Sequence, residues 1–157
     1  MDASSISMYL KETWATIYMT LISSSISYLI GIPLGVILVV TDKDGIHPMT
    51  PVHAVLGMLI NIFRSIPFLI LLVMVLPLTK MLVGTTLGPK AIIPPLIIAS
   101  APYIGRMVES SLKEVNAGVI EAAKSMGATN TQIIFKVLLP EAKPSLLVGA
   151  AICITTI

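Results

Sequence analysis

The side chains that most often perform chemistry in proteins are few in this chain, and their spacing does not favour catalysis. The 157 residues include one cysteine, two histidines and eight acidic residues. No H-E-x-x-H sequence, paired catalytic carboxylates or glycine-rich phosphate loop occurs. Cys153 stands alone in an apolar run, and His47 and His53 lie near a turn without a set of metal-binding partners. We therefore expect no enzymatic activity, and no metal or cofactor bound by this chain.

The composition instead favours an integral membrane protein. Hydrophobic residues make up 55% of the chain and charged residues only 11%, against about 25% charged in an average soluble domain. The mean hydropathy is +0.96, and the apolar residues fall in long runs. The net charge of +2 is small and dispersed, which argues against a nucleic-acid partner. Membrane lipid is the expected surrounding.

Four apolar runs predict membrane spans in a single transmembrane domain, 1–157. Because about 20 apolar residues cross the hydrocarbon core, we expect all-α spans at about 14–40, 51–78, 91–105 and 145–157. Three prolines in the third run predict that it is bent or broken. The last run is about 20 Å long as a helix, which is less than the roughly 30 Å core. We therefore expect the fourth span to be incomplete and the chain to be a fragment.

The segment 106–143 is the only sustained polar stretch. Gly127 predicts a helix stop, and Thr129 with Gln132 fits a capping box for a second helix that ends at Pro140. The segment is therefore expected to fold as helix, tight turn, helix. An apolar stripe at helical spacing supports the first helix: Val108, Leu112, Val115 and Val119.

The basic residues predict the orientation. Segment 106–143 contains five of the ten Lys and Arg residues, which places it on the cytoplasmic side. Counting back through the spans, the loop 80–90 lies outside, the turn 42–45 lies inside and the N-terminus lies outside. We expect this multi-pass arrangement in a membrane that borders the cytoplasm.

The strongest motif lies in the cytoplasmic segment. It consists of a Glu-Ala-Ala triplet, three residues, a glycine, nine residues, and then Val-x-Leu-Pro. It resembles the EAA loop of ABC-importer permeases, with Val137 in the place of isoleucine. The resemblance implies that this loop is a short coupling helix in a groove of a cytoplasmic ATPase; a solvated hairpin without a partner is the alternative. The matching positions are Glu121, Ala122, Ala123, Gly127, Ala128, Val137, Leu139 and Pro140.

The resemblance extends over about 10–157, where the chain is similar to methionine-import permeases. It rests on Asn61–Phe68, Gly84–Gly88, Ala101–Tyr103, Arg106–Glu109 and Met126–Thr129. The family implies a five-helix permease, of which this chain would hold about four helices. It also implies a homodimer that works with ATPase subunits, which bind ATP and magnesium, and with an extracytoplasmic binding lipoprotein. Amino-acid import by alternating access would be the function, with methionine as the cargo.

Four further residues are candidates for structural or pathway roles. Arg64 is a charge inside an apolar run, which suggests either a functional site or a side chain that reaches the membrane surface. Pro67 belongs to the Arg-Ser-x-Pro stretch of the resemblance. Gly31 and Gly35 form a G-x-x-x-G pair, which predicts close helix packing or a gating hinge.

Two other functions remain open on the sequence. The chain could import another amino acid or small organic solute with the same machinery. It could also be a membrane scaffold that transports nothing. Measuring which solute is taken up tests the first alternative. Measuring whether the chain stimulates ATP hydrolysis by a partner ATPase tests the second.

Overall fold

The structure is a computed structural model that describes residues 3–156, and the regular structure in that range is helical throughout. The elements are α1 (Ala3–Thr41), α2 (Thr50–Ser65), α3 (Phe68–Val83), α4 (Pro89–Lys113), α5 (Ala117–Ser125), α6 (Asn130–Ile133), the π-helical turn η1 (Ile134–Leu138) and α7 (Leu139–Thr156).

Three of the described helices are long and apolar enough to cross a membrane. They are Ser5–Thr41, Pro89–Lys113 and Asn130–Thr156, of 37, 25 and 27 residues. At 1.5 Å per residue, even the 25-residue helix measures about 38 Å, more than the roughly 30 Å of a bilayer core. The expected all-α membrane fold is confirmed for the described part of the chain.

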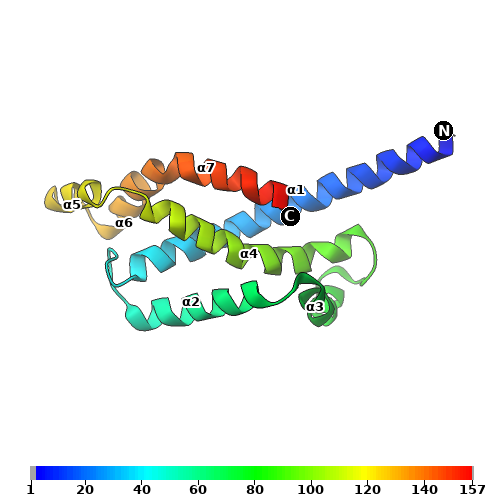
Figure 1. Cartoon of the computed structure of the whole chain (residues 1–157), viewed down its shortest axis with the longest axis horizontal. Coiled ribbons are helices and arrows are strands. Elements are labelled where there is room, and N and C mark those ends of the chain that lie inside the picture. Colours follow the sequence, from blue (N-terminus) through cyan, green and yellow to red (C-terminus); the bar gives the residue numbers. More distant parts are fainter. Residues whose placement is uncertain (1–2, 157) are drawn as a thin grey trace.

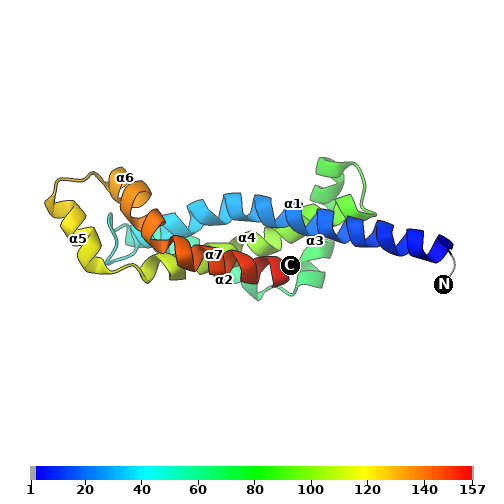
Figure 2. The same cartoon turned by 90° about the horizontal axis from the view of Figure 1, so that it is seen from above.

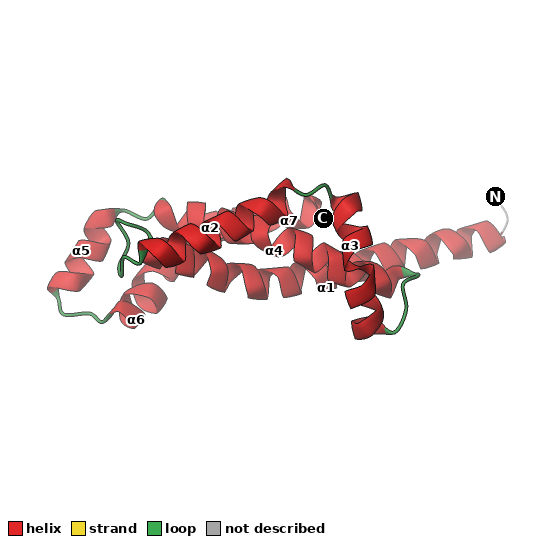
Figure 3. Ribbon diagram, turned by 90° about the horizontal axis from the view of Figure 1, so that it is seen from below, coloured by secondary structure: helices red, strands yellow, loops and turns green. Residues whose placement is uncertain are grey.

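The apolar run at 51–78 is divided between two helices rather than forming one straight span. Helices α2 and α3 are bent by 107° relative to each other, and α3 crosses the long axis of the bundle (Figure 3). The break lies at Ile66, which is extended at φ −78° and ψ 123°, and Pro67, the N-cap of α3. A residue before proline is disfavoured in the α conformation, so the Ile66-Pro67 pair ends α2.

Helix α4 lies at the centre of the bundle, where it contacts α1, α2, α3 and α7 (Figure 1). Its approach to α1 is close because two glycines of α1 face it. A Cβ on Gly31 would collide with Ile104, and one on Gly35 would lie 2.5 Å from Val108 Cγ1. The buried core continues from this contact through Leu112, Leu138 and Cys153.

The third apolar run is not broken, and the polar segment after it differs from the prediction. Helix α4 is unbroken through Pro94, Pro95 and Pro102, since a membrane helix tolerates prolines where neighbouring helices pack around it. The predicted helix through the apolar stripe is interrupted, because α4 ends at Lys113 and α5 begins only at Ala117.

The prediction that Pro140 ends a helix is also wrong. The chain is helical from Asn130 to Thr156, and Pro140 lies inside this helix. A π turn precedes the proline, with the Leu139 N–H donating to the Ile134 carbonyl. The proline ring clashes with the carbonyl four residues earlier in a regular α-helix, and a π turn there changes the local geometry without ending the helix. The last apolar helix therefore begins well before residue 145.

Candidate functional site

A helical hairpin, formed by α5, a glycine turn and α6, contains the Glu-Ala-Ala motif. It lies at the end of the long axis opposite the N-terminal end of α1 (Figures 1 and 2). Asn116 starts α5 by accepting a hydrogen bond from the Gly118 N–H at 2.8 Å. The predicted capping box at the start of α6 is confirmed, with the Thr129 side chain accepting from the Gln132 N–H and the Gln132 side chain accepting from the Thr129 N–H.

Gly127 makes the reversal between the two helices. Its φ is +79°, a conformation that side chains with a Cβ disfavour. The Ala128 N–H donates to the Ala123 carbonyl at 3.1 Å, and the Gly127 N–H donates to the Lys124 carbonyl at 2.9 Å. These two bonds are a Schellman ending, so the predicted helix stop at Gly127 is confirmed.

The motif residues divide between an exposed face and an anchoring face of the hairpin. Glu121, Ala122 and Gly127 are exposed, whereas Ala123 is only 4% exposed and is buried by the chain itself. In the second half of the motif, Val137, Leu139 and Ala128 are half-buried and Pro140 is exposed. The exposed motif residues could therefore contact another protein, but Ala123 could not do so without rearrangement.

The hairpin is anchored by apolar residues that the sequence analysis did not single out. Leu138 and Ile133 are fully buried, and Ile120 packs against the core cluster. Leu138 lies between the motif residues Val137 and Leu139. The hairpin is thus joined to α1 and α4 through side-chain packing.

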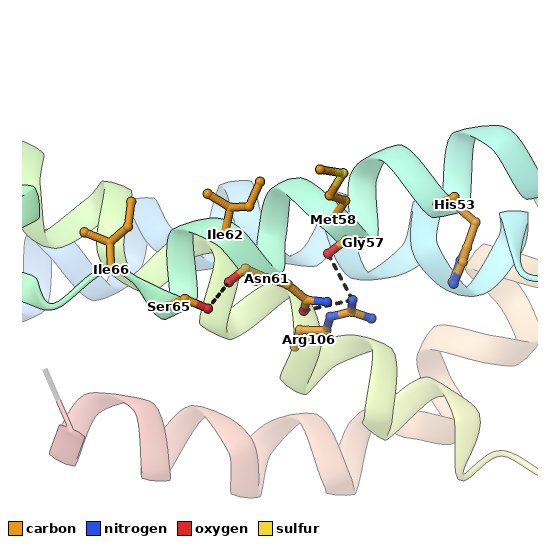
Figure 4. A pocket seen from close by; sticks show the side chains of 9 residues that line it. His53, Gly57, Met58, Asn61, Ile62, Ser65, Ile66 and Arg106 are labelled. Carbon is orange, nitrogen blue, oxygen red and sulfur yellow. Dashed lines mark hydrogen bonds between the residues drawn. The ribbon is translucent and has the colours of Figure 1, made fainter.

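An ionic network at the same end of the molecule joins three helices. Lys113 Nζ lies 2.7 Å from Asp42 Oδ2 and 2.9 Å from Glu109 Oε1, and Arg106 Nη1 lies 2.6 Å from Glu109 Oε2. The Arg106 Nη2 donates to the Gly57 carbonyl and to Asn61 Oδ1, both at 3.2 Å (Figure 4). The network connects the end of α1, one face of α4 and the middle of α2.

Glu109 is the centre of this network. It is only 5% exposed, and a buried carboxylate is costly unless it is paired and hydrogen-bonded. Both of its oxygens have cationic partners. The network was not predicted from the sequence, although Arg106, Glu109 and Lys113 are spaced three and four residues apart, as residues on one helical face are.

The electrostatics of Asp42, which follows α1, agree with the pairing. The hydrogen bond from Lys113 is the largest cause that holds the pKa of the Asp42 carboxyl below its ordinary value, and the Lys43 backbone N–H adds to the effect. Asp42 is therefore ionised at neutral pH, and its charge complements Lys113.

His53 lies beside the network. Its Nδ1 lies 3.0 Å from the Leu38 carbonyl oxygen. Because a carbonyl oxygen can only accept, Nδ1 is the donor in this hydrogen bond. One ligand atom of each of Asp42, His53 and Glu109 lies within 4.8 Å of the others, a grouping that the sequence did not predict. Lys113 already supplies a positive charge to both carboxylates of this group.

Two other candidates lie away from the hairpin. The Arg64 guanidinium lies 5.9 Å from the centre of the Tyr103 ring, and its side chain is exposed. This cation–π contact joins α2 to α4. Pro67 is the residue at which the chain turns from α2 into α3.

Comparisons with known proteins all find similarity to membrane components of transport systems. A family model described as "Binding-protein-dependent transport system inner membrane component" matches residues 27–157. The D-methionine transport system permease protein MetI of Yersinia pestis is 47% identical over 147 residues, which are 94% of this chain and 68% of that protein. The corresponding protein of Escherichia coli K12 is 45% identical over 150 residues, 96% of this chain and 69% of that protein.

A solved structure shows the same helical arrangement. A chain of the MetNI methionine ABC transporter, in an inward-facing conformation, superposes with a TM-score of 0.97 at 44% identity. The match covers 99% of this chain and 72% of the other. The similarity includes the central helix, the bent pair and the hairpin, since it extends over almost the whole chain.

Proposed function

Because the chain belongs to the family of binding-protein-dependent transport system inner membrane components, we propose that it is the membrane-spanning permease of an ATP-driven methionine importer. The observation that supports this proposal most strongly is the family match over residues 27–157, which includes the whole α5–α6 hairpin. Methionine is the proposed cargo because proteins 45–47% identical to this chain are D-methionine transport permeases.

The α5–α6 hairpin is the proposed coupling element. Glu121 and Ala122 lie on its exposed side, and its buried side packs on the core that α1 and α4 share. A cytoplasmic ATPase that binds the exposed side can therefore move the spanning helices as it closes on ATP. ATP and magnesium belong to that partner in this proposal, and this chain does no catalysis.

The proposed orientation places the hairpin in the cytoplasm and the N-terminus outside. The turn Asp42–Gly45 and the hairpin line the same pocket of about 490 Å³, so they lie at the same end of the bundle. This agrees with an alternation of inside and outside ends along the chain, and with the basic character of 106–143. A second copy of the permease and an extracytoplasmic binding lipoprotein complete the proposed assembly.

Uptake of radiolabelled methionine tests the function. The permease is produced with its ATPase and binding lipoprotein in cells that lack other methionine importers. We expect ATP-dependent uptake of D- or L-methionine, with a strain that expresses only the ATPase and lipoprotein as the control. Uptake of a different solute with no competition from methionine would overturn the cargo. No uptake of any solute, in spite of an assembled complex, would favour a scaffold.

A further inference from the structure

A groove with basic and aromatic walls lies where the N-terminal part of α1 passes the loop between α3 and α4. Its volume is about 430 Å³, and its lining includes Lys11, Trp14 and Tyr18 of α1 and Lys90 at the start of α4. Lys11 and Lys90 are 79 positions apart (90 minus 11), so only the fold brings these two lysines to one groove. Figures 1 and 2 show that the N-terminal end of α1 projects beyond the other helices at this end of the molecule.

The depth of the groove in a membrane follows from the lengths of two helices. The ion pair of Lys113 with Asp42 marks the opposite end of the bundle. Along α4, Lys90 lies 23 residues before Lys113 (113 minus 90), which is about 35 Å. Along α1, Trp14 lies 27 residues before Thr41 (41 minus 14), which is about 40 Å. A bilayer measures about 30 Å across its hydrocarbon core and about 40–45 Å with its headgroups, so the groove lies at headgroup level on the far surface.

The aromatic side chains of the groove suit the boundary between hydrocarbon and headgroups. Trp14 is 70% exposed, and Tyr18 is also exposed. Tryptophan and tyrosine concentrate at this boundary because each has an apolar ring and a polar N–H or O–H. Leu87, on the loop that forms the other wall, is exposed as well. An acyl chain in the groove would remove these apolar surfaces from water, which is favourable.

The two lysines of the groove lack an acidic counterpart. None of the ion pairs among the described residues includes Lys11 or Lys90, and both side chains are exposed. Glu12 follows Lys11 directly but points about 100° away around the helix, and it does not line the groove. No acidic residue occurs between Asp44 and Glu109, so the other wall contributes none. The groove therefore has the charge to attract an anion.

We propose that this groove binds an anionic phospholipid, with the phosphate held by Lys11 and Lys90 and an acyl chain lying along Trp14 and Tyr18. A phospholipid carries a negative charge and an apolar chain in one molecule, and it places the phosphate at the depth of the two lysines. The bound lipid contacts both α1 and the start of α4, so it joins them at this surface. That the lipid belongs to the outer leaflet rests on the proposed orientation, whereas the site itself does not.

Trp14 provides a local probe of the groove, because it is the only tryptophan of the sequence. The complete permease is placed in nanodiscs of phosphatidylcholine that contain a small fraction of brominated phosphatidylglycerol, or the same fraction of brominated phosphatidylcholine. Bromine quenches tryptophan fluorescence at short range, and subtracting the signal of Trp14→Phe isolates Trp14. We expect the quenching to correspond to an enrichment of the anionic lipid by about tenfold or more. Equal quenching by the two brominated lipids would overturn the proposal.

Replacing single lysines distinguishes binding in the groove from a general attraction of anionic lipid. Lys11→Gln and Lys90→Gln should each lower the enrichment about fivefold, as expected for one lysine near a charged membrane surface. Lys80→Gln is the matched control, because Lys80 is exposed near the end of α3 but does not line the groove. Its enrichment should stay close to native. Equal losses for Lys80→Gln and Lys90→Gln would mean a diffuse attraction, and would overturn the proposal.

Two further measurements distinguish the lipid from other anionic partners. Inorganic phosphate, compared with sodium chloride at equal ionic strength, should leave the enrichment unchanged; loss of the enrichment would indicate a site for free anions instead. The binding lipoprotein should bind native and Lys90→Gln nanodiscs equally. Weaker binding to Lys90→Gln, with the lipid enrichment unchanged, would assign the lysines to an acidic protein surface and overturn the proposal. Both sides of a nanodisc carry the same lipids and no uptake is measured, so a failure of the proposed function or orientation would leave these results unchanged.

Discussion

Lys113 Nζ lies 2.7 Å from Asp42 Oδ2, so an ion pair fixes the end of α1 to the end of α4. The same ammonium lies 2.9 Å from the buried Glu109. One cation therefore joins two helices and neutralises a buried carboxylate immediately before the chain enters the α5–α6 hairpin. The network therefore lies where the spanning helices α1 and α4 end, next to the α5–α6 hairpin.

Removing this cation should destabilise the permease. Lys113→Met leaves Glu109 with one fewer partner, and we expect a loss of about 1–3 kcal/mol of stability. Thermal unfolding of the purified protein in detergent measures the change. Lys43→Met is the control, because the Lys43 side chain is 79% exposed and should contribute little. Equal melting temperatures for Lys113→Met and the native permease would contradict the structural role of the network.

The lowered pKa of Asp42 should make the stability of the permease depend on pH in the acid range. Its pKa is lowered in the folded protein, chiefly by the hydrogen bond from Lys113. A lowered pKa contributes stability that is present above the ordinary value, about pH 4, and is lost as the pH falls through the lower folded value. The melting temperature of Asp42→Asn should therefore fall less than that of the native permease below about pH 4. Asp44→Asn, whose side chain is 86% exposed, should behave like the native permease.

The α1–α4 contact should not tolerate a larger residue. Gly35→Leu places a side chain where Val108 and the Gly105 carbonyl already lie. Overpacking of this kind costs about 1–3 kcal/mol, so we expect a lower melting temperature and less folded permease in the membrane. Ser25→Leu is the control, because Ser25 is exposed on the same helix. If Gly35→Leu accumulates and melts like Ser25→Leu, α1 and α4 are not packed as described.

Gly127 should be replaceable by asparagine but not by valine. The surrounding space is open, so the restriction comes from the backbone φ of +79° alone. Asparagine visits this conformation more readily than β-branched residues do. We expect Gly127→Val to lose about 1–3 kcal/mol of local stability and to bind the ATPase weakly, with Gly127→Asn close to native. Pull-down of the ATPase from membranes compares the two; similar loss in both would indicate a steric contact with the partner instead.

The sequence predicted the membrane class, the hairpin, the capping box and the glycine turn because each depends on local residue types. It did not predict the break at Ile66, although Pro67 was a local signal for it. The continuation of the helix through Pro140 depends on a π turn, which has no simple sequence signature. The Asp42–Lys113 pair joins residues 71 positions apart (113 minus 42), and only the packing of α1 on α4 brings them together.

The burial of Ala123 changes which motif residue is expected to meet the ATPase. A substitution at Ala123 would disrupt the hairpin itself, because the chain already buries this residue. Ala122 is exposed beside it and can be enlarged without a loss of folding. Ala122→Arg is therefore a more specific probe of coupling, with Lys124→Ala as an exposed control on the same helix.

ATP-dependent methionine uptake by Ala122→Arg tests the proposal that α5 couples the permease to its ATPase. The permease variants are compared in membrane vesicles with the ATPase and the binding lipoprotein, at equal permease abundance. We expect Ala122→Arg to reduce coupled uptake by about tenfold or more, equivalent to about 1.4 kcal/mol of lost docking free energy, and Lys124→Ala to keep near-native uptake. Native uptake by Ala122→Arg, with the ATPase still bound, would contradict the assignment of α5 as the coupling helix.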